Sequence, residues 1–219
     1  MITAKNVLIF KRFFRKYYEQ YGRQFPWREN GTPAFHLLIA EMLLRQTKAT
    51  QVAAIWPEVI DRFPTPETLV NARLDELFSL VQPLGLGHQR ADALISMSNA
   101  LVLCFGSEVP NSYQGLMDLP HVGMYSAAAV SCFAFGHQTP VVDANVLRLL
   151  GRIAGNDFGR DNRRSPEVWE LAKSILPPRF PREHNYGILD FSAQICIYRA
   201  PKCEECAILR ACAFGSSIT

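Results

Sequence analysis

Residues 116–130, LMDLPHVGMYSAAAV, hold a short L-P-x-V-G turn between two helix-forming segments. A helix ends before the turn, and a new helix is expected to open at Met124 or Tyr125. Such a turn directs backbone N–H groups outward at a helix N-terminus, where they can bind a phosphate without positive side chains. This stretch therefore predicts helices joined by a phosphate-binding hairpin, with an ordinary helix–turn–helix connection as the alternative.

The rest of the chain has helical rather than strand periodicity. No run alternates with the two-residue period of a strand, and Thr65, Pro66 and Glu67 have the pattern of a helix start. Apolar residues recur at helical spacing in 34–60, 67–80, 89–104, 125–135, 145–154 and 166–175. We therefore predict an all-α fold.

Residues 5–22 form an aromatic and basic segment with the pattern of an amphipathic helix. Such helices are usually half-buried, so we expect this one to pack on the C-terminal part rather than on a membrane. It then joins the cysteine-rich end in one lobe, made of 1–28 and 137–219. Residues 29–136 form the other, with the helix–hairpin–helix at about 113–130.

Composition and charge restrict the class of protein only loosely. The 219 residues suffice for one large domain or two small ones, and a net charge of +3 with a pI near 8.6 allows a polyanionic partner without requiring one. Lysines and arginines interrupt the apolar N-terminal segment, and no secretory signal is recognisable. We expect an intracellular protein of the cytoplasm or nucleoid, with no membrane partner.

Four cysteines lie near the C-terminus in a C-x6-C-x2-C-x5-C run: Cys196, Cys203, Cys206 and Cys212. In a reducing compartment such a run binds metal more often than it forms disulfides. Both zinc and a [4Fe-4S] cluster accept four thiolates. Zinc sites usually pair two C-x2-C hooks, so the single hook with longer flanking gaps favours the [4Fe-4S] cluster, with zinc as the alternative. Cys104 and Cys132 are expected to be small buried hydrophobes.

Asp143 lies in TPVVDANVLRLLGR, residues 139–152, between a proline-containing turn and an apolar helix. Aspartate is a preferred helix N-cap, which is one explanation for its position. A carboxylate at a helix start, close in sequence to a phosphate-binding hairpin, is also suited to face the sugar of a bound nucleotide. The two roles are compatible.

Together these segments resemble the helix-hairpin-helix, Gly/Pro-Asp (HhH-GPD) family of DNA glycosylases, which includes endonuclease III. The resemblance covers nearly the whole chain, and the order and spacing of the motifs match. It implies a two-lobed all-α HhH-GPD fold with a C-terminal [4Fe-4S] cluster loop. The matching segments are FPWR (25–28), AEMLLRQTKATQV (40–52), LGLGHQRADAL (84–94), the hairpin, VVDANVLRLLGR (141–152) and DFSAQICIYRAPKCEECAILRAC (190–212).

Within the family, LLRQT, NYGILDFSAQIC and PKCEEC are most similar to glycosylases that remove thymine or uracil mispaired with guanine. The adenine-mismatch branch is the alternative, but its members usually continue into a further domain, whereas this chain ends seven residues after Cys212. A non-catalytic DNA-structure binder would need neither Glu41 nor Asp143. The expected partner is double-stranded DNA containing a mismatch, bound by a monomer.

The resemblance also assigns catalytic residues. Asp143 matches the family aspartate that stabilises an oxocarbenium-like sugar and orients water, and Asn145 matches an asparagine beside the sugar or acts as a second helix cap. Glu41 matches a pocket carboxylate that protonates adenine in the adenine branch, and is here expected to hydrogen-bond the base edge. Strand-cutting members use a lysine where this chain has Tyr125. Because a phenol forms no imine, we expect little or no lyase activity.

Other positions match the family's DNA contacts. Gln46 matches the side chain that fills the gap left by a flipped base, with an exposed helix-end glutamine as the alternative. The usual hairpin reads L-P-G-V-G, and His121 replaces its first glycine. If this position has a positive φ, histidine is more strained there than glycine. The remaining expected contacts are Arg45, Leu86, Val122 and Gly123.

Overall fold

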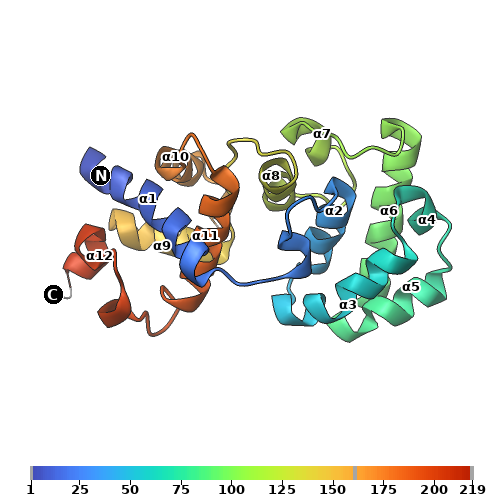
Figure 1. The fold of residues 1–219 in the computed structure, drawn as a ribbon, viewed down its shortest axis with the longest axis horizontal. Helices are drawn as coiled ribbons and strands as arrows, with labels where there is room; N and C mark the ends of the chain where they lie inside the picture. Colours follow the sequence, from blue (N-terminus) through green and yellow to red (C-terminus); the bar gives the residue numbers. More distant parts are fainter. Residues whose placement is uncertain (1, 160–161, 218–219) are drawn as a thin grey trace. The chain divides into compact units, whose positions relative to one another are not determined.

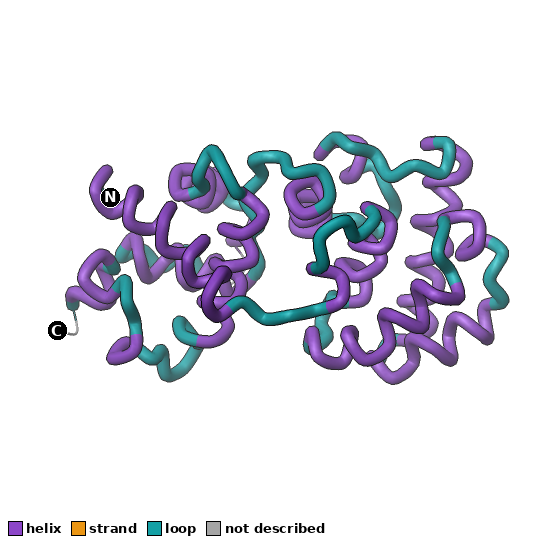
Figure 2. The backbone as a smooth tube through the Cα atoms, in the orientation of Figure 1, coloured by secondary structure: helices purple, strands orange, loops and turns teal. Residues whose placement is uncertain are grey.

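A computed structural model describes residues 2–159 and 162–217 of the chain. All regular structure in this part is helical, as the colouring of Figure 2 shows, and the all-α prediction is confirmed. The described residues divide into two compact units, a terminal unit within 1–23 and 136–219 and a central unit of 24–135. Among the described residues, no helix has both the length and the apolar character needed to cross a membrane.

The terminal unit is built around the first helix, α1 (Ala4–Tyr21), which packs against α11 as the sequence predicts (Figure 1). Phe10 and Phe14 are fully buried, and the ring of Phe14 meets that of Phe191 edge-on at 5.6 Å. A side chain at Gly187 would overlap the backbone of α1, so glycine permits this close approach. The other helices are α9 (Ala144–Ala154), η3 (Asn162–Arg164), α10 (Pro166–Ile175), α11 (Pro181–Gln194), η4 (Cys203–Glu205), η5 (Leu209–Ala211) and α12 (Ala213–Ser216).

A buried ion pair fixes the end of α1 to the same helix, α11. Asp190 is fully buried and accepts two hydrogen bonds from Arg23, one from the backbone N–H at 2.8 Å and one from Nε at 2.6 Å. Bonds of both kinds to one carboxylate offset the cost of burying its charge. The chain is thereby held where it leaves α1.

The central unit carries the hairpin. Its helix α6 packs on α4 and α5, while α2 and α7 both pack on α8. In the core between them, Leu38, Leu94 and Ala128 are at or near zero exposure. The helices are η1 (Pro26–Arg28), α2 (Ala34–Leu43), α3 (Ala49–Arg62), α4 (Pro66–Val70), α5 (Leu74–Val81), η2 (Gln82–Leu84), α6 (Gly87–Phe105), α7 (Tyr113–Met117) and α8 (Met124–Phe133).

Two of the predicted periodic segments are interrupted. The segment 34–60 is broken at 44–48, where Gln46 has a φ of 55°, outside the helical region. The segment 67–80 is divided between α4 and α5. The predicted helix start is confirmed, since Thr65 and Thr68 form a reciprocal capping box at the N-terminus of α4.

Two further expectations need correction. Helix α11 was not among the predicted segments, because its polar residues His184 and Asn185 are buried and hide the apolar period. Cys132 is fully buried as expected, but Cys104 is exposed. Cys104 lies in the last turn of α6 on a face that turns to solvent, so an apolar segment did not guarantee burial.

Candidate active site and metal centre

The hairpin joins α7 to α8 through residues 118–123. Val122 is buried and donates a hydrogen bond to the carbonyl of Leu119 at 3.2 Å, which closes the turn. No side chain caps α8 at Gly123, so the start of this helix is suited to an anionic ligand. His121 is exposed with a φ of 62°, the left-handed conformation that strains a non-glycine residue.

Glu41 and Tyr125 lie on α2 and α8, two helices of the central unit that pack on each other. Glu41 is only 3% exposed and lies in the last turn of α2, a helix whose other residues, apart from His36, are apolar. A carboxylate in such surroundings is uncommon unless it is paired or has a function. Tyr125 is half-buried in the first turn of α8.

Gln46 and Leu86 are exposed residues in two short loops of the central unit. Each has a φ of 55°, and Leu86 is 55% exposed although it is aliphatic. Arg45, beside Gln46, donates a hydrogen bond to the carbonyl of His121 at 3.2 Å. This hydrogen bond therefore connects the loop that carries Gln46, the expected gap-filling residue, to the tip of the hairpin within one unit.

Asp143 caps α9 in the terminal unit. Its Oδ1 accepts the N–H of Val146 at 2.7 Å, and its Oδ2 accepts the side-chain amide of Asn145 at 3.2 Å. Desolvation raises the pKa of Asp143 above its usual value, although the hydrogen bonds from Val146 and Asn145 and the charge of Arg148 act in the opposite direction. The capping role is confirmed, and it orients the carboxylate.

Arg148 extends this set of hydrogen bonds toward the cysteines. Its guanidinium donates to Oδ1 of Asn145 at 2.9 Å and to the carbonyl oxygen of Cys196 from two nitrogens, at 2.8 and 3.0 Å. It also donates to the carbonyl of Ser192 at 2.7 Å. Hydrogen bonds thus run without a break from Asp143 to the first cysteine of the predicted ligand set.

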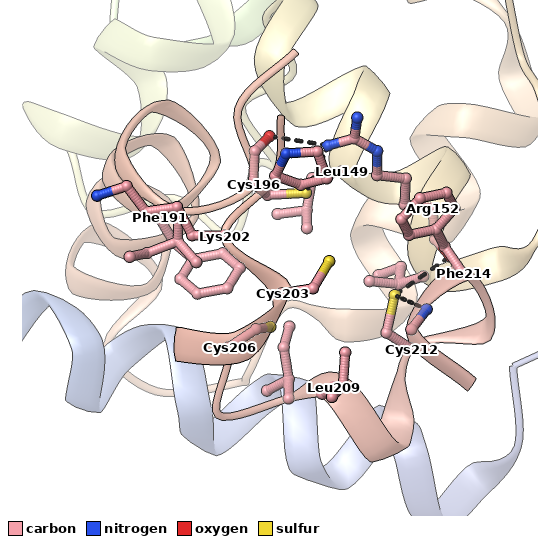
Figure 3. A pocket seen from close by; sticks show the side chains of 15 residues that line it. Leu149, Arg152, Phe191, Cys196, Lys202, Cys203, Cys206, Leu209, Cys212 and Phe214 are labelled. Carbon is pink, nitrogen blue, oxygen red and sulfur yellow. Dashed lines mark hydrogen bonds between the residues drawn. The ribbon is translucent and has the colours of Figure 1, made fainter. Parts of the chain in front are cut away.

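The four predicted metal ligands line one pocket in the terminal unit (Figure 3): Cys196, Cys203, Cys206 and Cys212. All four are free thiols, and apolar side chains such as Leu149 and Phe191 complete the wall. Arg152 donates a hydrogen bond to Sγ of Cys196 at 3.3 Å. Four sulfur donors in an apolar pocket fit an iron–sulfur cluster.

The protonation of the thiols and the spacing of possible ligand side chains both bear on metal binding. Burial raises the pKa of the Cys206 thiol to about 11 and raises that of Cys212, so metal binding has to displace protons. Within the described ranges, no three His, Cys, Asp or Glu side chains are grouped closely enough to hold one ion.

The expected site residues fall in different units. Asp143, Asn145 and the cysteines belong to the terminal unit, whereas Glu41, Tyr125, the Gln46 and Leu86 loops and the hairpin belong to the central unit. Three arginines that organise these sites were not predicted: Arg90, Arg148 and Arg152. Each lies inside a quoted motif, but each also donates to acceptors more than forty residues away in sequence, and only the fold reveals those contacts.

Comparison with known families establishes the class of protein. Residues 39–177, more than half of the chain, match the HhH-GPD superfamily of base excision DNA repair proteins. The chain therefore belongs to this superfamily, and the resemblance read from the motifs is confirmed.

Individual relatives refine this assignment. The chain is 34% identical over 212 residues to a thymine/uracil-DNA glycosylase of Methanothermobacter thermautotrophicus, covering 97% of this chain and 96% of the relative. The structure of a thermostable thymine-DNA glycosylase superposes with a TM-score of 0.92 at 33% identity, over 97% of this chain and 98% of that one. An adenine DNA glycosylase of Mycobacterium tuberculosis is 33% identical over 196 residues, which cover 88% of this chain but 63% of the relative.

Proposed function

We propose that this protein is a DNA glycosylase that hydrolyses the N-glycosidic bond of thymine or uracil mispaired with guanine. The observation that carries the proposal is the capped and oriented carboxylate of Asp143. It occurs in a chain that aligns over almost its whole length with a thymine/uracil-DNA glycosylase. The same alignment favours thymine or uracil over adenine as the base that is removed.

Asp143 is the proposed catalytic carboxylate. As the glycosidic bond breaks, the sugar gains positive charge, and an anion beside it stabilises the transition state and orients the attacking water. Val146 and Asn145 each bind one carboxylate oxygen, so the charge is fixed before the substrate arrives. A fixed charge avoids reorganisation during the reaction.

Recognition of the target base is assigned to the central unit. The base has to leave the helical stack, at a lower energetic cost when it is mispaired. We assign Glu41 to a hydrogen bond with the base edge, and Gln46 to the gap that the base leaves. Arg45 and Leu86 contact the orphan guanine. The start of α8, with His121, Val122 and Gly123, binds a backbone phosphate.

The enzyme is proposed to be monofunctional because Tyr125 occupies the position of the strand-cutting lysine. A phenol cannot form the imine that precedes strand cleavage. The attacking group is therefore water, and the product is an intact strand with an abasic site.

The four cysteines of the pocket are proposed to bind a [4Fe-4S] cluster, with zinc as the alternative. The set of thiol donors and the N–H···S contact from Arg152 support this proposal. When bound, such a group cross-links residues 196–212 and so supplies structural rigidity. Arg148 would transmit this rigidity to Asn145 and Asp143 through its hydrogen bonds.

The two compact units are proposed to be the two domains expected from the sequence, and the protein is proposed to act as a monomer in the compartment that holds DNA. Each of these points follows from the glycosylase assignment. Light scattering of the free and DNA-bound protein would test the monomer.

A panel of labelled duplexes tests the reaction. Duplexes with T/G, U/G, A/G and A/oxidised-G pairs are incubated with the enzyme, then heated in alkali to cleave abasic sites. We expect cleavage of T/G and U/G at the pyrimidine, and none without alkali. Cleavage at adenine would support the adenine branch. Binding without cleavage of any duplex would support a non-catalytic DNA-structure binder.

A further inference from the structure

A single buried arginine connects the two loops that carry Gln46 and Leu86. Arg90, in the first turns of α6, is 8% exposed. Its Nε donates to the carbonyl of Gly85 at 2.8 Å, next to Leu86. Its terminal nitrogens donate to the other loop and the end of α2: to the carbonyls of Met42 at 3.4 Å, Leu43 at 3.1 Å and Arg45 at 2.8 Å, and to the hydroxyl of Thr47.

Arg90 lies at the C-terminal end of α2, where it can bind the last carbonyl groups of that helix. The last carbonyls of α2 have no partner within the helix, and a cation there interacts favourably with the helix dipole. Among the described residues Arg90 has no carboxylate partner, and burial together with the charge of Arg45 lowers its pKa. Burying a cation that is bound only by backbone oxygens and one hydroxyl costs free energy, because no opposite charge compensates for its lost hydration. It therefore needs an explanation beyond capping.

The two connected loops share an unusual conformation. Gln46 and Leu86 both have a φ of 55°, which non-glycine residues adopt only when the surrounding structure enforces it. In each case the peptide carbonyl just before the strained residue accepts a hydrogen bond from Arg90. The arginine thus fixes both backbones at the point where each side chain is turned out to solvent.

We propose that Arg90 is a positioning residue that couples the Gln46 and Leu86 loops, so that both side chains enter the duplex as one preformed unit when the target base leaves. This inference rests on the proposed function, and it adds a residue that touches no DNA. Side chains ordered in advance lose less entropy on binding. Their joint insertion then offsets more of the cost of unstacking the base.

Non-additivity of substitutions tests the coupling. Arg90→Gln is made in the wild type, in Gln46→Ala and in Leu86→Ala, and single-turnover base release is measured on the preferred mismatch. Arg90→Gln is expected to slow release about tenfold or more in the wild type but less than about threefold in either alanine background, since residues that act through one another are not additive. Equal slowing in all three backgrounds, or none in the wild type, overturns the proposal.

A second measurement follows base extrusion and does not depend on base release. 2-Aminopurine placed beside the mismatched thymine brightens when the base is extruded, and Arg90→Gln should reduce this signal. If the wild type gives the extrusion signal but releases no base from any duplex, the proposed function fails while the coupling stands. An unchanged signal in Arg90→Gln overturns the coupling. The exposed Arg62→Gln, which breaks ion pairs with Glu58 and Glu76, is the matched control and should leave the signal unchanged.

Hydrogen exchange detects the coupling in the free protein. In Arg90→Gln, amides in 44–48 and in 85–87 should both exchange faster, and Arg90→Lys, which keeps the charge but not the planar fork, should restore only part of the protection. If Arg90→Gln does not fold, Thr47→Val and Arg90→Lys take its place in the same comparison. Faster exchange in only one of the two loops overturns the proposal.

Discussion

The backbone N–H of Val146 donates a 2.7 Å hydrogen bond to Oδ1 of Asp143, so the proposed catalytic carboxylate is also the N-cap of α9. The two roles predict different responses to substitution. Capping needs an oxygen acceptor, which asparagine also offers. Stabilising a positively charged sugar needs the negative charge.

Asp143→Asn therefore separates the roles. We expect base release in a single turnover to fall about a hundredfold or more, the effect of losing one transition-state electrostatic group, while thermal stability and mismatch binding stay close to wild type. Asp143→Ala should lose activity and also about 1 kcal/mol of stability, because the cap is removed. Near-normal turnover by Asp143→Asn would reduce Asp143 to a helix cap.

The rate should also depend on pH through Asp143. The pKa of this carboxyl is raised mainly by desolvation, so its protonated form persists to higher pH than the usual 3.8. The active form is the carboxylate, so base release should fall as the pH decreases through this raised pKa. The linked effect on stability has the opposite sign, because ionisation is disfavoured in the folded state, and stability decreases as the pH rises through the same value. Single-turnover rates that stay flat down to pH 3.8 would contradict this expectation.

The metal centre is tested by colour and by melting. We expect purified protein to be yellow-brown with a broad absorbance near about 400 nm, which zinc does not give. Cys203→Ser should lose this band and destabilise the terminal unit by about 2–5 kcal/mol, the effect of removing a cross-link. Cys104→Ser, outside the pocket, is the control and should change neither. A colourless active protein with one zinc per chain would show that the cluster assignment is wrong.

The monofunctional assignment is tested by introducing a lysine at Tyr125. An amine at this position can attack the anomeric carbon, so Tyr125→Lys should form a covalent complex with mismatched DNA when borohydride is added during turnover. The wild type should form almost none, and Tyr125→Phe serves as the control that lacks both groups. Strong trapping by the wild type would mean that another amine is the nucleophile.

Local sequence patterns were sufficient to predict the features whose interacting residues lie within a few positions of each other. The cap at Asp143 and the capping box at Thr65 each join residues three apart, and the hairpin lies within one short stretch. The breaks at 44–48 and within 67–80 were not predicted, because apolar periodicity continues across them. The first break is held by Arg90, which lies 45 residues from Arg45 in sequence.

The same limit applies to the candidate site. The four cysteines and Asp143 were recognised from residue type and spacing. By contrast, the connection from Arg148 to Cys196 spans 48 residues, and no local pattern distinguishes that arginine from a surface one. Residues that position others through long-range hydrogen bonds therefore require the fold.

The most direct test of the proposed function is to identify the free base that the enzyme releases from a T/G duplex. Mass spectrometry of the supernatant should detect thymine in amounts equal to the abasic sites formed, with far less from Asp143→Asn after the same incubation time. The partner strand should remain intact. Release of adenine from A/G duplexes without thymine from T/G, or release of no base at all, would contradict the account.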